Sequence, residues 1–437
     1  MQSQSDQKLA LGGGTKTREL AWPEWPTYDD GTERALRSVL HSGRWTISGP
    51  FTGQSSKERL FARQFAQYCD SNYCTPVTSG TASLTIALLA LGIGGGDEVL
   101  IPGLTWVACA SATMAVGAVP VMVDIDPATL AMSISAARRA VSDRTAAIMV
   151  VHPYCRVADL DGFLALSEDM GVPLVEDCSQ AHGARWRGRR VGSLGVLGCF
   201  SMQQSKILTS GEGGAVVTSD RELYGRLEQL RADGRMFSSE PMRGSLELEE
   251  VGLVQGHNFC LGEFQAAVLL DRLAHLDEQN ARRRQFVQTL RHKLERQTIA
   301  WLPLEDPRAE PTYYNLVLEL EMDKFGGNSV DAVARAMTAE LGVQVSPVYR
   351  PTNRHPLYRP LLSPRYRDDA ARAAALDPSR FALPNADAAR ERFITFPNWV
   401  LLAGDEGVDD ILAALRKVAG CWEELLGLEQ GISQQAF

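Results

Sequence analysis

Short apolar segments rich in β-branched residues alternate along the chain with longer segments of helical periodicity. The β-like segments lie at 98–103, 119–125, 146–151, 173–178, 199–202 and 213–219. Apolar residues recur at helical spacing over 56–69 and again over 79–92, where a Ser-Gly-Thr turn opens the helix. Strands that alternate with helices predict an α/β fold with a mostly parallel sheet covered on both faces. In such sheets ligands bind beyond the carboxyl ends of the strands.

The second half of the chain has a different pattern. A long amphipathic segment at about 262–297 predicts a helix that bridges two domains. After it come a β-like segment at 313–321, a helical segment at 329–342, the segment VQVSPVY at 343–349 and a final helical segment at 409–427. This order predicts a smaller α+β domain.

The length of 437 residues fits two unequal domains, because single cores stop growing near roughly 250 to 300 residues. We predict an N-terminal arm at 1–35, which is polar and rich in Gly, Pro and Trp, a large domain at 36–275 and a small C-terminal domain at 276–437.

The charge balance argues against polyanionic partners. The net charge is -9 and the sequence pI is near 5.4, so we expect neither nucleic acid nor an anionic membrane as a partner. The basic runs at 185–190 and 281–284 are read as solvated faces. The N-terminal segment lacks the apolar core of a signal peptide, and no apolar run reaches about 18 residues. We therefore expect a cytoplasmic protein.

The eight cysteines are scattered, and several lie inside apolar runs, which is typical of reduced, buried thiols. Cys69 and Cys74 have no matching second pair and no histidine cluster beside them, so no metal site is expected.

Lys206 lies in FSMQQSKILTSGEGG, between two apolar β-like segments. A lone lysine is usually a solvated surface charge. Burial between two strands would instead favour the neutral amine, which is the nucleophile needed to form a Schiff base.

Two further segments place polar groups at the ends of predicted strands. Asp177 ends the apolar run VPLVED, where it would either cap a following turn or face a pyridinium nitrogen; Glu176 would point to the opposite face of the strand. Ser79-Gly80-Thr81-Ala82 opens a helix after a β-like segment, so its free N–H groups form either a simple cap or a cradle for phosphate. Trp106 follows the strand at 98–103 and would either pack in the core or lie on a heteroaromatic ring.

Four of these motifs occur together in a fixed order: SGTASL, PGLTWVACA, VEDCSQAHGA and FSMQQSKILTSGEGG. In order and spacing they resemble the sugar aminotransferases of the DegT/DnrJ/EryC1/StrS family, a branch of the fold type I enzymes that use pyridoxal 5'-phosphate (PLP). The resemblance extends from about residue 36 to the end and includes GHNFCLGEFQAAVLLDRL and VYRPTNRHPLYRP. It implies a large domain with a mostly parallel, seven-stranded type of sheet.

The resemblance also implies a role for individual residues. Lys206 would be the Schiff-base lysine, Asp177 would face the pyridine nitrogen, Trp106 would stack on the ring and Gln180 would contact the phenolic oxygen. The phosphate would be held by Gly80, Thr81, Ala82 and Ser201, and by Asn258 from the neighbouring subunit of a homodimer with shared active sites. Two positions depart from the family pattern, which often has Arg at Cys260 and Gly at Cys155.

Within the family, the sequences of segments 176–195 and 201–214 look closest to those of glutamine-dependent aminotransferases. These enzymes act on keto-inositols such as scyllo-inosose in aminocyclitol antibiotic biosynthesis. The expected reaction moves an amino group from an amino-acid donor, L-glutamine, to a small keto acceptor. A nucleotide-linked keto-hexose is the alternative acceptor, and 3-amino-5-hydroxybenzoate synthase is a more distant resemblance. A PLP-binding regulator without turnover is the alternative of another class, but the chain shows neither a helix-turn-helix module nor a basic face.

Overall fold

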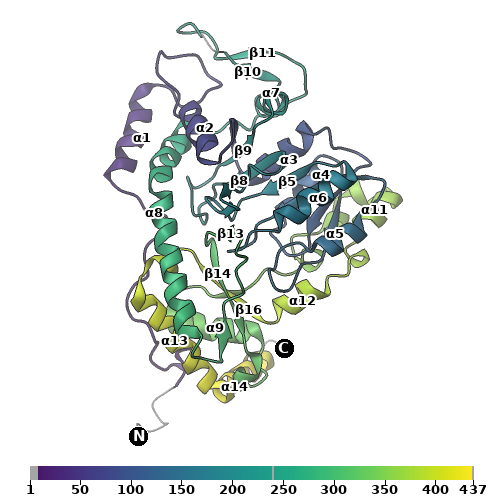
Figure 1. Ribbon diagram of the computed structural model, residues 1–437. Coiled ribbons are helices and arrows are strands. Elements are labelled where there is room, and N and C mark those ends of the chain that lie inside the picture. Colours follow the sequence, from purple (N-terminus) through teal and green to yellow (C-terminus); the bar gives the residue numbers. More distant parts are fainter. Residues whose placement is uncertain (1–7, 239–240, 436–437) are drawn as a thin grey trace.

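The computed structural model describes residues 8–238 and 241–435 and contains two main sheets (Figure 1). The larger sheet has seven strands in the order β1-β9-β8-β5-β4-β2-β3. Their bounds are β1 Tyr73–Val77, β2 Glu98–Pro102, β3 Val119–Val123, β4 Thr145–Val151, β5 Leu174–Asp177, β8 Leu197–Ser201 and β9 Gly214–Thr218. All strand pairs from β3 to β8 are parallel, which confirms the predicted α/β fold.

The strand β9 runs antiparallel to both of its neighbours, β8 and β1. The reason is the connection from β8 to β9, which contains no helix in residues 202–213. A parallel neighbour needs a long crossover, usually through a helix, whereas a tight connection returns the chain in the opposite direction. This connection carries Lys206.

Helices flank the larger sheet. Because they cover it, its strands are buried along almost their whole length. Contacts join α3 to β8 and β9, α6 to β5 and α2 to β1. The bounds are α2 Lys57–Tyr68, α3 Gly80–Ala90, α4 Ala108–Ala115, α5 Ile134–Ala140, α6 Leu160–Met170 and α7 Arg221–Leu230. The predicted helices at 56–69 and 79–92 are thus confirmed as α2 and α3. Serine side chains begin both: Ser56 accepts from the Arg59 N–H and Ser79 from the Ala82 N–H.

The long helix α8 (Glu263–Leu294) runs from the larger sheet to the smaller one (Figure 1). It contacts α1 (Asp30–Ser42) and α2 near the larger sheet, and α13 (Asp405–Gly420) near the smaller one. The helix predicted at about 262–297 is therefore present, with its end three residues earlier than expected, and its role as a bridge between two domains stays a prediction.

The smaller sheet is antiparallel, with the order β12-β14-β16-β15. Its strands are β12 Ala300–Trp301, β14 Asn315–Leu320, β15 Ser346–Pro347 and β16 Phe393–Pro397, and α9 (Val330–Leu341) packs on it. The prediction of a single final helix at 409–427 is wrong. The helix is interrupted at Cys421, whose backbone leaves the helical region (φ -111°, ψ 28°). As a result α13 and α14 (Trp422–Gln435) are separate helices.

Short elements complete the described chain. They are β6 Arg185–Trp186, β7 Arg189–Arg190, β10 Arg235–Phe237, β11 Leu248–Glu250, β13 Ala309–Glu310, α10 Pro364–Arg367, α11 Ala370–Leu376 and α12 Pro384–Arg390, with 3-10 turns at 10–12, 322–325, 352–354, 360–362, 378–380 and 400–402.

The segment that carries α10 to α12 returns from the smaller sheet to the larger one. The Thr352 N–H donates to the Gly103 carbonyl (2.7 Å), and the Asn385 amide donates to the Ile125 carbonyl (2.9 Å). The two parts of the chain are thus tied together beyond β2 and β3. The domain boundaries 36–275 and 276–437 stay a prediction.

The N-terminal segment from residue 8 lies against the smaller sheet's helices. The Ala10 N–H donates to the buried Glu340 carboxylate (2.8 Å), and the Trp22 indole donates to the Leu341 carbonyl (2.7 Å). Of the arm predicted at 1–35, the described residues 8–29 contain no strand and no helix longer than the 3-10 turn at 10–12, and α1 already begins at Asp30; residues 1–7 lie outside the described part.

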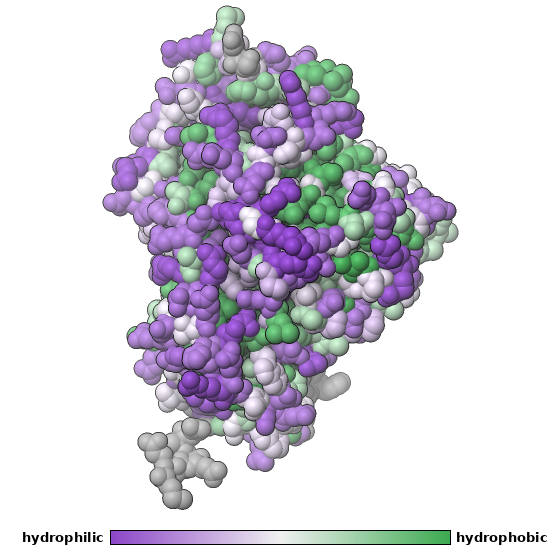
Figure 2. Space-filling model, in the orientation of Figure 1, coloured by the Kyte–Doolittle hydropathy of each residue, from purple (hydrophilic) through white to green (hydrophobic). Residues whose placement is uncertain are grey.

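The face seen in Figure 2 is mostly hydrophilic, and hydrophobic residues gather over the region where α3, α4 and α6 lie in Figure 1. Within residues 8–238 and 241–435, no helix combines the length and the apolar character needed to cross a membrane. Six of the cysteines, at 69, 74, 109, 155, 178 and 199, are buried thiols, as predicted.

A buried group of charged side chains ties α2, β1 and α7 together. Arg231 contacts Glu58 at 2.6 Å and Glu228 at 2.8 Å, and Arg59 contacts Glu228 at 2.9 Å. The Thr75 hydroxyl also donates to Glu228 (2.9 Å). Burial raises the pKa of Glu228 to about 7, because the Arg59 charge does not fully offset the lost hydration and the Glu58 charge adds to the shift.

We predict that Glu228 makes stability fall as the pH rises. Its pKa is raised from 4.5 to about 7, so the folded chain keeps a proton that the unfolded chain has released. The stabilisation is complete below about pH 4.5 and is lost as the pH rises through 7. Relative to Glu228→Gln, the native chain should lose a few kcal/mol between pH 5 and 8, at about 1.4 kcal/mol per unit of pKa. Urea unfolding at both pH values measures this difference.

Glu222→Gln is the matched control, because Glu222 lies on the same helix but is exposed and pairs only with Arg226 in the described chain. The difference in free energy of unfolding between the native chain and Glu222→Gln should be the same at pH 5 and 8. A difference between the native chain and Glu228→Gln that is the same at pH 5 and 8 would contradict the prediction.

Candidate active site

A cavity of about 440 Å³ lies beyond the carboxyl ends of β5 and β8. Asp177 is the last residue of β5, Ser201 is the last residue of β8, and α3 begins after β1. The position agrees with the expectation for a parallel sheet. The lining residues are Ser79, Gly80, Thr81, Leu84, Thr105, Trp106, Ala108, Asp177, Ser179, Gln180, Ser201, Gln203, Ser205, Lys206, Glu212, Tyr314 and Tyr349.

Lys206 is held in the cavity wall by a tight loop. Its N–H donates to the Gln203 carbonyl (2.8 Å), and the Gln203 side chain accepts from both the N–H and the hydroxyl of Ser205. The Asn398 amide also donates to the Ser205 carbonyl (2.9 Å). The lysine is only half-buried, which is less than the sequence led us to expect, and its Nζ lies 4.1 Å from the centre of the Tyr314 ring.

The Asp177 carboxylate is buried and uses both oxygens. Oδ1 accepts from the Ser179 N–H (3.0 Å), and Oδ2 accepts from the Cys109 thiol (3.4 Å). The turn contact expected for a capping aspartate is therefore present, and the same carboxylate also lines the cavity. Burial and the Asp177 charge raise the pKa of Cys109, so this thiol stays protonated and remains a donor.

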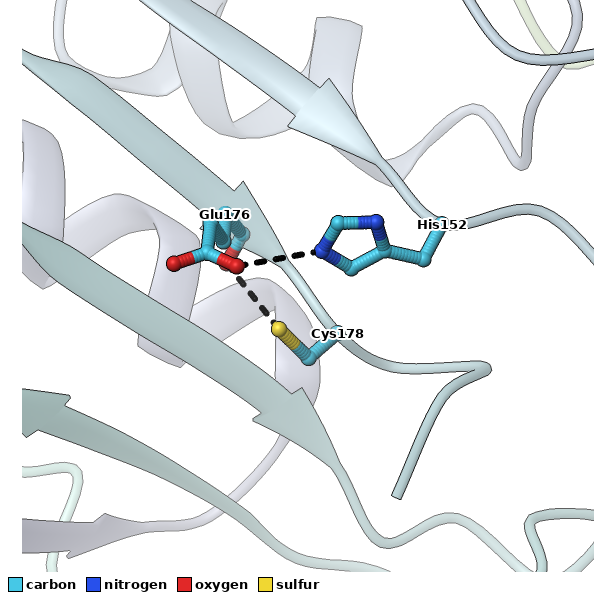
Figure 3. Close-up of side chains that lie close together, drawn as sticks. All are labelled: His152, Glu176 and Cys178. Atoms are coloured by element: carbon cyan, nitrogen blue, oxygen red, sulfur yellow. Dashed lines mark hydrogen bonds and ion pairs between the residues drawn. The ribbon is translucent and has the colours of Figure 1, made fainter. Parts of the chain in front are cut away.

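Glu176, the preceding residue, does not line the cavity, which agrees with its predicted place on the opposite face of the strand, and it lies beside His152 and Cys178 (Figure 3). It accepts from the N–H groups of Gly192, Leu194 and Gly195 at 2.6–2.9 Å and contacts His152 Nε2 at 3.2 Å. His152 Nδ1 accepts from the Ala158 N–H, so the ring proton lies on Nε2 and points at Glu176. Burial alone would raise the pKa of Glu176, but these hydrogen bonds lower it. Glu176, His152 and Cys178 are all buried, and none of them lines the cavity.

The first turn of α3 presents free N–H groups to the cavity. The Ala82 N–H donates to Ser79 Oγ (3.1 Å), but among the described residues no acceptor contacts the N–H of Gly80 or Thr81. Position 80 must be glycine, because a Cβ there would lie 2.5 Å from Ser201 Cβ. The helix can therefore start directly against the end of β8. Free N–H groups at a helix N-terminus favour an anion.

Trp106 lies at the edge of the cavity. Its side chain is 46% exposed, so the alternative of core packing is wrong. The ring meets His355 edge-on at 5.6 Å and Tyr349 at 6.0 Å. An aromatic face in this place can cover a planar ligand.

Gln180 is buried in the cavity wall with its carbonyl already used. Oε1 accepts from the Tyr154 N–H at 2.6 Å, so the amide nitrogen is the group left to donate into the cavity.

Two predicted residues do not line the cavity. Ala82 is buried and its N–H is taken by Ser79, while Asn258 is exposed and pairs with Ala232 outside the cavity. Their predicted contacts with phosphate stay predictions. The departures Cys155 and Cys260 also lie outside the cavity lining; Cys155 follows Tyr154 in the chain, and Cys260 donates to the Arg231 carbonyl.

The sequence did not point to several lining residues. Ser179, Gln203 and Ser205 are neighbours of predicted residues, so proximity in the chain was an available signal. Tyr314 and Tyr349 come from the smaller sheet, beside β14 and β15, and no local pattern marks them.

The lining groups fit PLP. A primary amine, a carboxylate, free N–H groups at a helix start and an aromatic face surround one cavity, and these are the groups that a covalently held, phosphorylated pyridine needs. The tight packing at Gly80 supports the phosphate end of this fit, because any side chain there would close the space.

Comparisons with known proteins agree with this chemistry. L-glutamine:scyllo-inosose aminotransferase of Streptomyces griseus is 48% identical over 414 residues, covering 94% of this chain and 98% of the relative. L-glutamine:2-deoxy-scyllo-inosose aminotransferase of Streptoalloteichus tenebrarius is 48% identical over 411 residues, covering 94% and 97%. The crystal structure of 3-amino-5-hydroxybenzoic acid synthase matches with a TM-score of 0.75 and 32% identity, covering 91% of this chain and 98% of that one. The aminotransferase from Psychrobacter cryohalolentis matches with a TM-score of 0.76 and 26% identity, covering 93% and 100%.

The model of the DegT/DnrJ/EryC1/StrS aminotransferase family matches residues 26–416, which is most of the chain. The chain therefore belongs to the DegT/DnrJ/EryC1/StrS family and is a PLP-dependent aminotransferase.

Proposed function

We propose that this enzyme moves the amino group of L-glutamine to a keto-cyclitol, scyllo-inosose or its 2-deoxy form, in aminocyclitol antibiotic biosynthesis. The observation that carries the proposal is the 46–48% identity to seven relatives named for these two reactions, each matched over 94–96% of this chain. A protein named for a further aminated cyclitol substrate is more distant, at 35% identity.

The chemistry of the cavity supports a small polyhydroxylated acceptor. Hydroxyl and amide side chains dominate the lining, and the volume of about 440 Å³ must hold the cofactor as well as the substrate. Hydroxyls and amides both donate and accept hydrogen bonds, so they match a ring that carries hydroxyls on every side.

Within this function, Lys206 is the residue that binds PLP covalently and Asp177 faces the pyridine nitrogen. When bound, PLP supplies an electron sink and a carrier for the amino group between donor and acceptor. The Lys206 amine, once released, is in place to move the α-proton of the donor. The Asp177 charge, held by the Ser179 N–H and the Cys109 thiol, keeps the pyridine nitrogen protonated.

The remaining predicted contacts complete the cofactor site. Trp106 covers the ring, and the Gln180 amide donates to the phenolic oxygen. The phosphate lies at the start of α3, with Gly80, Thr81, Ala82 and Ser201 around it. The free N–H groups of Gly80 and Thr81 support this placement.

The active unit is a homodimer in the cytoplasm, in which Asn258 reaches the phosphate of the neighbouring subunit. Asn258 is exposed and is not among the residues that line its own chain's cavity, which supports a role toward a partner. A twofold dimer is the commonest oligomer, so the shared site is the part of this proposal that needs a test.

The acceptor is identified by a substrate panel. With L-glutamine as donor, we expect amination of scyllo-inosose or 2-deoxy-scyllo-inosose, detected by mass spectrometry, and none of nucleotide-linked 4-keto or 3-keto hexoses. Lys206→Ala is the blank that removes background. Turnover of only the nucleotide-linked sugars would replace the cyclitol with the alternative acceptor, and turnover of none by a PLP-loaded chain would favour a regulator.

Borohydride should fix the cofactor to Lys206. The purified protein should be yellow, and peptide mapping after reduction should find the pyridoxyl group on this residue, because only a covalent bond between the amine and PLP is reducible. Lys206→Ala should still bind PLP through the start of α3 but should lose turnover. Lys16 or Lys57, which are outside the cavity, should carry no label. A label on any other lysine refutes the assignment.

Mixed dimers test the shared site. Lys206→Ala and Asn258→Ala subunits should each be inactive alone, the second because a lost hydrogen bond to a charged phosphate costs about 1.5 to 3 kcal/mol. If each site uses Asn258 of the neighbour, the mixed dimer has one site with both lesions and one with neither. Activity should then reappear after verified subunit exchange. Two inactive parents that recover nothing would mean that Asn258 serves its own chain.

A further inference from the structure

Tyr314 places a phenol directly beside the Lys206 amine. The Lys206 Nζ lies over the Tyr314 ring, 4.1 Å from its centre, and both side chains line the cavity. The Tyr314 hydroxyl is also 3.2 Å from Ser205 Oγ, in the loop that holds the lysine. The Tyr314 hydroxyl is also a hydrogen-bond partner of the Lys206 amine.

The surroundings of the Tyr314 hydroxyl favour loss of its proton. Burial would raise the pKa of Tyr314, but the Lys206 charge and hydrogen bonds with Ser205, Tyr349 and Lys206 lower it below its ordinary value. The effect on Tyr349 is the opposite: burial and the neighbouring Tyr314 raise its pKa, so Tyr349 stays a phenol. Tyr349 therefore donates to Tyr314, and Tyr314 is the member of the pair that can give up a proton.

Tyr154 holds both tyrosines in position. Its carbonyl accepts from the Tyr314 N–H (3.1 Å), and its hydroxyl accepts from the Tyr349 N–H (2.8 Å). Tyr154 is 2% exposed, its ring stacks on Tyr349 at 5.2 Å, and its backbone has φ 57°, which is unfavourable for a residue with a side chain. Such a conformation persists only where the surroundings enforce it, and it is often found at functional sites.

We propose that Tyr314 is a further catalytic residue, which exchanges a proton with Lys206 Nζ each time the lysine is released from or returned to its covalent bond. The proposal rests on the assignment of Lys206 as the covalent lysine. It concerns the proton transfers at this nitrogen and leaves the choice of acceptor open.

The proton balance of the exchange requires such a group. The lysine and the amino donor compete for the same carbon of the cofactor. When the donor replaces the lysine, a bond would form between this carbon and the donor nitrogen, and the bond between this carbon and Nζ would break. One proton must leave the donor nitrogen and one must reach Nζ. Tyr314 gives its phenolic proton to Nζ and takes the proton of the donor nitrogen, so it ends unchanged and nothing is oxidised or reduced. A positioned acid–base group of this kind contributes about 10²–10⁴-fold to a rate.

The first test is Tyr314→Phe, which keeps the ring over Lys206 and removes only the hydroxyl. With L-glutamine and no acceptor, the change in cofactor absorbance on rapid mixing should be slowed by about 10²-fold, the lower end of that range. The rate of the unaltered enzyme should fall at alkaline pH as the phenol loses its proton, and this fall should be absent in the variant. The rate at which the cofactor-free chain attaches PLP should also fall, while the final amount on Lys206 after borohydride stays the same.

Tyr313→Phe is the matched control, because the adjacent Tyr313 is also buried and loses a hydroxyl bond, to Glu305 at 2.9 Å, outside the cavity lining. Its rates should equal those of the unaltered enzyme. Tyr349→Phe keeps the Tyr314 hydroxyl but removes a hydrogen bond that lowers its pKa, so the alkaline fall should move to higher pH.

The outcomes separate this inference from the proposed function. If borohydride does not label Lys206 in the unaltered enzyme, the assignment of the lysine fails and the inference fails with it. If Lys206 is labelled and Tyr314→Phe matches Tyr313→Phe in both rates and in pH profile, Tyr314 has no catalytic role. If Tyr314→Phe does not fold, Tyr349→Phe decides: a shifted alkaline fall supports the inference and an unchanged one overturns it.

Discussion

The active site depends on how closely the start of α3 approaches the ends of β8 and β9. Ser201 ends β8, and a Cβ on Gly80 would lie 2.5 Å from Ser201 Cβ. On the other side, a Cβ on Gly214 would lie 2.4 Å from the Ser79 carbonyl. Two glycines thus let three backbone segments meet where larger residues would separate them. The free N–H groups of the helix and the loop that carries Lys206 consequently open into the same cavity.

The neighbouring carboxylates Glu176 and Asp177 lie on one strand but in different surroundings. Successive side chains of a strand point to opposite faces. Glu176 meets three backbone N–H groups and His152, so its charge is balanced inside the fold. Among the described residues, Asp177 accepts hydrogen bonds from a turn N–H and the Cys109 thiol, both weaker partners for a charge than a cation would be, and it lines the cavity. The carboxylate left with capacity is the one that can meet a ligand.

The smaller sheet completes the cavity rather than merely standing beside it. Tyr314 precedes β14 and Tyr349 follows β15, yet both reach the wall that Lys206 forms. Tyr154, on the loop after β4, bonds to both of them and also to Gln180. Gln180 and the two tyrosines beside the smaller sheet are therefore connected through one buried residue, Tyr154. A shift of either sheet would change the position of Tyr314 relative to Lys206.

The sequence by itself determined the α/β class, the strands at 98–103 and 173–178, the long helix and the positions of Lys206 and Asp177, because these follow from local periodicity and from motifs that are contiguous in the chain. Only the tertiary structure decided that β9 runs antiparallel, that the final helix breaks at Cys421 and that Tyr314 and Tyr349 join the site. Strand direction depends on the length of a connection as well as on its pattern. The tyrosines come from segments more than a hundred residues beyond Lys206, and contacts at such separation are set by packing between sheets, which no local pattern records.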